Sequence, residues 1–264
     1  MRKLVLGLAA VVAFAVAASA QTTPPPAAPV PAAPAAPAPA AAAPAPVAAA
    51  AKPVSDIAPY YVNIVDLQIS PSSMTKFMAD LSDDVKGTLA EAGVHEIDGN
   101  VGQNDPNHVF IFEVYNNSAA WDSHQKTTTY VKFVGLTMMM IKNYNIRPFS
   151  SLVMNSSGAA PASDPLYVNV EEFDLAADQY NNFVVAAKVE AGGAVQDPGV
   201  REFNIATSTS TPYHILFFEV YDNAAAHDAE MATDRYKTYE STTKSMIKKS
   251  TATPYSSVSL NAKP

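Results

Sequence analysis

Two stretches of the chain carry acid–base side chains at matching positions. In the first, Glu113 lies inside an apolar run and His124 follows eleven residues later; in the second, Glu219 lies in a similar run and Glu230 stands where a histidine would be expected. Histidine suits a general base near neutral pH, and a carboxylate inside an apolar strand needs a partner when it is buried. The asymmetry predicts a base in the first stretch alone. A structural histidine and structural ion pairs are the alternative interpretation.

The region that contains both stretches repeats with a period of 106 residues and without a gap. Two copies are too few for a solenoid, so we expect a fused pseudo-dimer that is monomeric as a chain. The first repeat spans 58–157 and the second 164–264. The matching segments are Tyr61–Asn63 with Tyr167–Asn169, His108–Tyr115 with His214–Tyr221, and Pro148–Ser151 with Pro254–Ser257.

Each repeat shows the pattern strand, helix, strand, strand, helix, strand. In the first, residues 61–69 alternate as a strand, a helix follows Pro71, and the run 108–115 is apolar on both faces. A second helical stretch is expected from Asn117 to about Asn143, with Thr127–Thr129 as the place where it can break, and a last strand from Ile146 to Met154. This order predicts an α+β fold in which two ferredoxin-like βαββαβ repeats pack sheet to sheet as an intrachain barrel.

The segment from Phe112 to His124 resembles the antibiotic biosynthesis monooxygenase domain, in which a strand ends in Glu-x-aromatic and a helix carries an alanine and then a histidine. The segment 218–230 resembles the same motif without its histidine. The resemblance implies a dimeric α+β barrel with both halves in one chain. It also implies a cofactor-independent monooxygenase that binds a small apolar or phenolic ligand, with no metal.

The resemblance also suggests roles for individual residues of the first repeat. His124 would act as base, with Asn63 and Tyr130 as hydrogen-bonding groups. Trp121 would form a stacking wall, and Tyr115, Val134 and Met138 would complete the substrate-binding surface. After residue 117 the first copy has the wider apolar helix face, which favours a working pocket there. The alternative is a ligand-binding or interaction module that kept the barrel and lost the chemistry.

The first 57 residues have the composition of a targeting segment and a tether. Residues 1–20 combine a basic start, an apolar run and a small-residue end, which predicts a signal peptide cleaved before Gln21. Residues 21–57 are rich in proline and alanine, which favours a linker without a core of its own. These features predict a periplasmic or secreted protein.

Composition argues against several other functions. The net charge of −8 and the absence of a basic stripe disfavour nucleic acid as a partner. The five histidines are scattered and there is no cysteine, so no metal cluster is predicted. Phosphate-binding glycine loops and dinucleotide fingerprints are missing from the sequence, and past the signal peptide no run is apolar enough to span a membrane.

Overall fold

Eight strands and their covering helices account for the repeated pattern. The computed structural model describes residues 59–157 and 165–259, so the predicted signal peptide and linker lie outside the described residues. In the first repeat the elements are β1 (Tyr61–Ile69), η1 (Pro71–Ser73), α1 (Met74–Leu89), β2 (Val94–Gly102), β3 (His108–Tyr115), α2 (Ser118–His124), α3 (Thr128–Thr137) and β4 (Ile141–Ser156). In the second they are β5 (Tyr167–Leu175), α4 (Tyr180–Ala194), β6 (Val200–Ser208), β7 (His214–Tyr221), α5 (Ala224–Met231), α6 (Asp234–Thr243), η2 (Lys244–Met246) and β8 (Ile247–Ser259).

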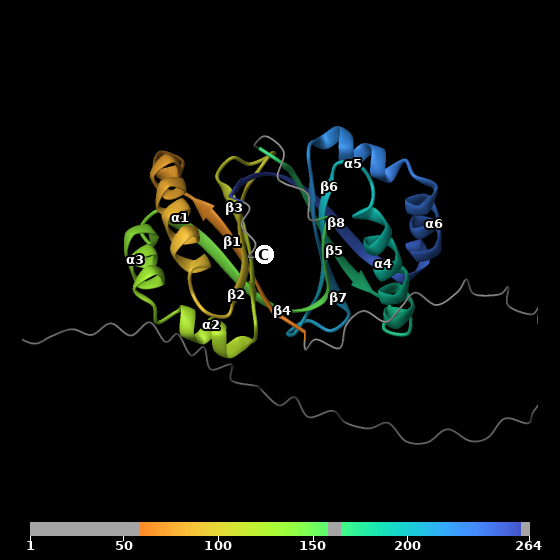
Figure 1. Cartoon of the computed structure of the whole chain (residues 1–264), viewed down its shortest axis with the longest axis horizontal. Coiled ribbons are helices and arrows are strands. Elements are labelled where there is room, and N and C mark those ends of the chain that lie inside the picture. The colour runs from red at the N-terminus through yellow and green to blue at the C-terminus, as the bar shows by residue number, and fades with distance from the viewer. Residues whose placement is uncertain (1–58, 158–164, 260–264) are drawn as a thin grey trace, which may run out of the picture. The chain divides into compact units, whose positions relative to one another are not determined.

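The strands close into one antiparallel barrel in the order β1-β3-β2-β8-β5-β7-β6-β4. Within each repeat the order is that of a ferredoxin-like sheet, and the repeats are joined by β2 with β8 and by β4 with β6. The helices of each repeat cover the outer face of their own half (Figure 1). The predicted fold and the intrachain barrel are therefore confirmed.

Strand β3 is apolar on both faces because each face enters a different core. Phe110, Phe112 and Val114 point into the barrel interior, where they pack with side chains of β1, β5 and β7. Val109 and Ile111 point outward and pack beneath α1. Its counterpart β7 divides its side chains in the same way, so one central core is shared by both repeats.

The helical stretch expected after Asn117 breaks where the run Thr127–Thr129 indicates, but its expected end near Asn143 is wrong. Asn117 caps α2 by accepting a hydrogen bond from the backbone N–H of Ala120, and Thr127 caps the separate helix α3. Helix α3 ends at Thr137, and β4 begins at Ile141 because its backbone pairs with Ile69 of β1. Pairing with β1 outweighs the helical pattern of the Met138–Met140 run, in which Met139 is 88% exposed.

None of the helices in the described ranges combines the length and the apolar character needed to cross a bilayer.

Candidate functional site in the first repeat

Glu113 is the polar centre beneath the helices of the first repeat. It lies opposite Asn63 in the β1–β3 pairing, on the outer face of the barrel. Asn63 Nδ2 donates to Glu113 Oε2 at 2.7 Å, and the Tyr115 hydroxyl donates to the same oxygen at 3.3 Å. Burial raises the pKa of Glu113 to about 7, although the Asn63 hydrogen bond opposes the shift. The group can therefore exchange a proton near neutral pH.

His124 ends α2 and is fixed by a carboxylate from the loop after α1. Its Nδ1 lies 2.9 Å from Glu91 Oε2, and only 2% of the residue is exposed. Burial lowers the pKa of His124, although Glu91 works in the opposite direction. The imidazole is therefore neutral at pH 7. With a carboxylate at Glu91, Nδ1 donates its proton and Nε2 carries the lone pair.

Three aromatic rings surround the imidazole. The ring centroids of Tyr115, Trp121 and Tyr130 lie 5.7, 5.6 and 5.0 Å from that of His124. Trp121 also meets the rings of Tyr115 and Tyr130 edge to face. The structure thus brings together four of the predicted site residues on β3, α2 and α3, while Asn63 joins them through Glu113.

Val134 and Met138 are the predicted site residues that the structure does not bring to this cluster. Val134 is half-buried on α3, and Met138 follows the helix with 54% of its surface exposed. Val131, which also belongs to the apolar face expected in the first copy, is 60% exposed. Because α3 ends early, much of this apolar face lies at the surface.

Helix α1 adds two polar residues that sequence reasoning missed. Asp84 and Thr88 are 7% and 0% exposed and share the buried face of α1. Within the described residues, Asp84 Oδ1, Thr88 Oγ1 and Asn63 Oδ1 are buried without a hydrogen-bond partner. Burial, reinforced by the charge of Glu91, raises the pKa of Asp84 to about 7. The sequence did contain a signal for Asp84, because this acidic residue lies among the apolar residues that form the buried face of α1.

The same place in the second repeat is filled by an arginine. Arg235, which takes the position of Thr129, binds Glu190 Oε1 at 2.7 Å, Glu230 Oε1 at 3.1 Å and the carboxylate of Asp197. These three acids occupy the positions of Asp84, His124 and Glu91. Gly193 makes the arrangement possible, because a Cβ there would overlap the Arg235 side chain. One guanidinium thus engages all three acids, and burial raises the pKa of Glu230 to about 8.

Among the described residues, hollows open on the helix side of both repeats, and His124 lines neither of the following two. One of about 170 Å³ opens between α1 and α3, with Asp84, Gly87 and Phe133 in its wall. The other, of about 390 Å³, lies between α6 and the start of β8, with Glu171 and Tyr239 in its wall. His124 is therefore closed off from both of these hollows.

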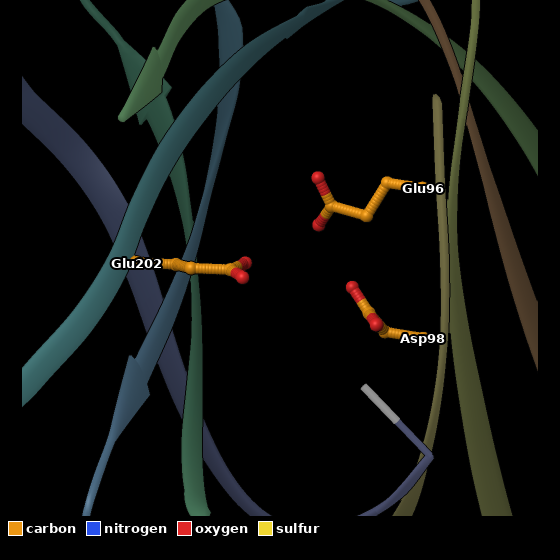
Figure 2. A group of neighbouring side chains, drawn as sticks. All are labelled: Glu96, Asp98 and Glu202. Atoms are coloured by element: carbon orange, nitrogen blue, oxygen red, sulfur yellow. The ribbon is translucent and has the colours of Figure 1, made fainter. Parts of the chain in front are cut away.

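A second acidic group lies inside the barrel. Figure 2 shows Glu96 and Asp98 of β2 pointing toward Glu202 of β6, with their oxygens within 4.8 Å of one another. Burial and the neighbouring carboxylates raise the pKa of Glu96 well above its usual range, and burial raises the pKa of Glu202 to about 8. Of the described residues, these three carboxylates are the group whose oxygens lie close enough together to bind one cation. Shared protons fit them equally well, because Glu96 is hydrogen-bonded to both neighbours.

Comparison with known proteins agrees with the duplicated architecture. The sequence model of the family named antibiotic biosynthesis monooxygenase matches residues 60–136 and again 166–241. The chain belongs to this family. No curated protein matches the chain.

Several solved structures are similar to this chain at low sequence identity. A protein from Lactobacillus acidophilus, provisionally assigned as a monooxygenase, is 20% identical over 78% of this chain and 96% of its own, with a TM-score of 0.71. A similarly assigned protein from Fusobacterium nucleatum is 18% identical over 78% and 95%, with a TM-score of 0.73. An anthrone oxidase-like protein is 10% identical over 78% and 94%, with a TM-score of 0.58. At these identities the similarity establishes the fold alone.

Proposed function

We propose that this family member is a cofactor-independent monooxygenase of quinols or other small phenols and that its working site lies in the first repeat. The contrast between the repeats carries the proposal. In the second, Arg235 pairs with all three acids, whereas the first keeps a neutral His124 beside Glu91 and a buried Asp84. Of the two sites, the first alone has a histidine at the position of His124, whereas His227 of the second repeat takes the position of Trp121 and contacts Asp228.

Once the phenol is bound, the protein needs to supply only a base and a site that excludes water. His124 Nε2 accepts the phenolic proton, and Glu91 holds the imidazole in the required tautomer and stabilises the imidazolium that forms. The electron-rich phenolate then reduces dioxygen. One oxygen atom enters the substrate ring, the other leaves as water, and the substrate supplies both electrons. Burial of the site protects the intermediates from solvent.

The neighbouring groups orient the substrate. Trp121 and Tyr130 are half-buried and form the aromatic wall next to the imidazole. Asn63 has its amide nitrogen engaged by Glu113, so its Oδ1 is the free atom and accepts a hydrogen bond from a second substrate hydroxyl. This requirement favours dihydroxyaromatic compounds over monophenols.

Oxygen uptake with dihydroxyaromatic substrates, without added flavin or metal, tests the proposal. His124→Ala should slow turnover by roughly 100-fold or more, the usual scale for loss of a general base. Glu230→Ala, the matched change in the second repeat, should leave the rate nearly unchanged. Equal losses in the two variants would refute the assignment of the base to the first repeat.

A non-catalytic ligand-binding module is the second candidate, and the burial of His124 favours it. Only 2% of the residue is exposed, and neither hollow reaches it. On this alternative, a panel of quinols produces no oxygen uptake while saturable ligand binding persists. Oxygen uptake that depends on His124 would exclude it.

The proposed location is the periplasm or the cell exterior. The basis is the pattern of residues 1–20, whose small-residue end Ala18–Ala20 suits signal-peptide cleavage. Intact-mass measurement of the protein from its native host should give a chain that starts at Gln21. Retention of Met1 in the cytoplasmic fraction would contradict secretion.

A further inference from the structure

The larger hollow belongs to the second repeat, away from the His124 site. It has a volume of about 390 Å³ and is enclosed by side chains of β5, α6, η2 and β8. This volume falls in the range of sites for small organic ligands. Phe173 and Ile247 contribute apolar surface, so the hollow can receive a ring.

Hydroxyl and carboxyl groups line the inner part of the hollow. Tyr239 Oη is buried without a well-formed hydrogen bond in the described residues, although Thr243 lies close enough to lower its pKa against the effect of burial. Glu171 is held by Asn169, whose Nδ2 donates to Glu171 Oε1 at 3.2 Å, and burial raises the pKa of Glu171. A buried phenol without a well-formed hydrogen bond calls for a polar group on the ligand. The inner wall therefore offers hydrogen-bonding partners for a ligand hydroxyl group.

Lysines line the outer part of the hollow. Lys244, Lys248 and Lys249 are all exposed, and none forms an ion pair with another described residue. On a protein whose net charge is −8, three unpaired ammonium groups around one hollow form a local positive potential. Glu240 is the one acid that shares this rim.

The first repeat has apolar or uncharged residues at most of these positions, and Lys248 is the exception because it corresponds to Lys142. Glu171, Tyr239 and Lys244 correspond to Val65, Phe133 and Met138, and Lys249 corresponds to Asn143. The copies keep the same fold at these positions, because the register between β5 and β8 repeats that between β1 and β4. Glu171, Lys244 and Lys249 are therefore charged in the second repeat alone, and charge at these positions is not needed to form the barrel.

We propose that this hollow is a second binding site, for a small aromatic acid that carries a ring hydroxyl. The carboxylate lies at the lysine rim, the ring packs against the apolar wall, and the hydroxyl bonds to Tyr239 and Glu171. The site is independent of the oxygenase proposal, since it shares no residue with the His124 cluster.

Calorimetric titration of the full chain with 4-hydroxybenzoate, and with neutral hydroquinone as the comparison ligand, tests the site. We expect saturable binding of 4-hydroxybenzoate, at least 10-fold tighter than any binding of hydroquinone. Changing both Lys244→Met and Lys249→Asn, the residues of the first copy, should weaken binding about 10-fold, because each partly solvated ion pair contributes modestly. Tyr239→Phe should weaken it about 5-fold through the lost hydrogen bond.

Lys237→Val is the matched control, because Lys237 is an exposed lysine of α6 outside the hollow and its first-copy counterpart is Val131. This variant and His124→Ala should bind 4-hydroxybenzoate as the unmodified chain does. Absence of saturable binding, an equal loss in Lys237→Val, or a loss in His124→Ala would each overturn the proposal. Oxygen uptake measures the proposed activity of the first repeat separately, and it should be unchanged in the variant that combines Lys244→Met and Lys249→Asn.

Discussion

Phe112 stacks on Phe218 across the middle of the barrel, with ring centroids 4.2 Å apart and ring planes 4° from parallel. The two residues are counterparts in the 106-residue repeat, so each copy contributes the same side chain to the contact. The pair marks the pseudo-twofold relationship between the repeats and anchors the core that they share.

We therefore expect Phe112→Ala to destabilise both repeats at once. Removal of a buried phenylalanine from a packed core costs about 3–5 kcal/mol of unfolding free energy. Met139→Ala, at a residue 88% exposed, is the control and should change it by less than about 0.5 kcal/mol. Urea unfolding followed by circular dichroism should show a single transition, and two separate transitions would contradict a shared core.

Stability should fall as the pH rises from about 5 to above 8. Glu96 and Glu202 have raised pKa values in the folded barrel and ordinary values when unfolded. The folded state therefore holds protons that the unfolded state has released, and the stabilisation present at low pH is lost as these groups ionise. Asp98 and the amide of Asn204 face the same pair. Glu202→Gln should flatten this pH dependence of the melting temperature; an unaltered slope would show that other groups cause it.

Stability at low pH depends on an ion pair that joins the two repeats. Arg147 binds Glu172 at 2.7 Å and Asp66 at 3.0 Å. Although burial opposes it, hydrogen bonds from His214 and Arg147 hold the pKa of Glu172 at about 2. A depressed pKa contributes stability above pH 4.5 that is lost as the pH falls toward 2. Arg147→Met should reduce stability at pH 7 by about 2 kcal/mol and weaken its acid dependence. An identical loss at pH 7 and pH 3 would argue against this link.

The activity proposed for the first repeat should rise with pH to a plateau. His124 must be neutral to accept a proton, and burial lowers its pKa, so the rise should be centred below the ordinary value of about 6.5. Glu91→Gln removes the group that raises this pKa and should move the rise to lower pH while reducing the plateau rate. The pH dependence of oxygen uptake measures both effects. A shift to higher pH would contradict the contact between His124 and Glu91.

The sequence by itself determined the architecture. The period of 106 residues, the alternation along residues 61–69 and the doubly apolar run 108–115 require two sheets that share a core, because each apolar face must be covered. It also pointed to the difference between His124 and Glu230. Both the architecture and this difference can be predicted from the sequence, because they depend on local periodicity and on comparison of the two copies.

Only the tertiary structure decided the partners of the charged groups and the place of the hollows. Glu91 meets His124, Arg235 meets Glu190 and Asp197, and Glu96 meets Glu202 across the barrel, all over long separations in the chain. Helical periodicity placed Met138 on an apolar face, whereas pairing of β4 with β1 ended the helix and left the side chain exposed. Such contacts depend on strand register and helix length, and those are fixed by packing between distant segments.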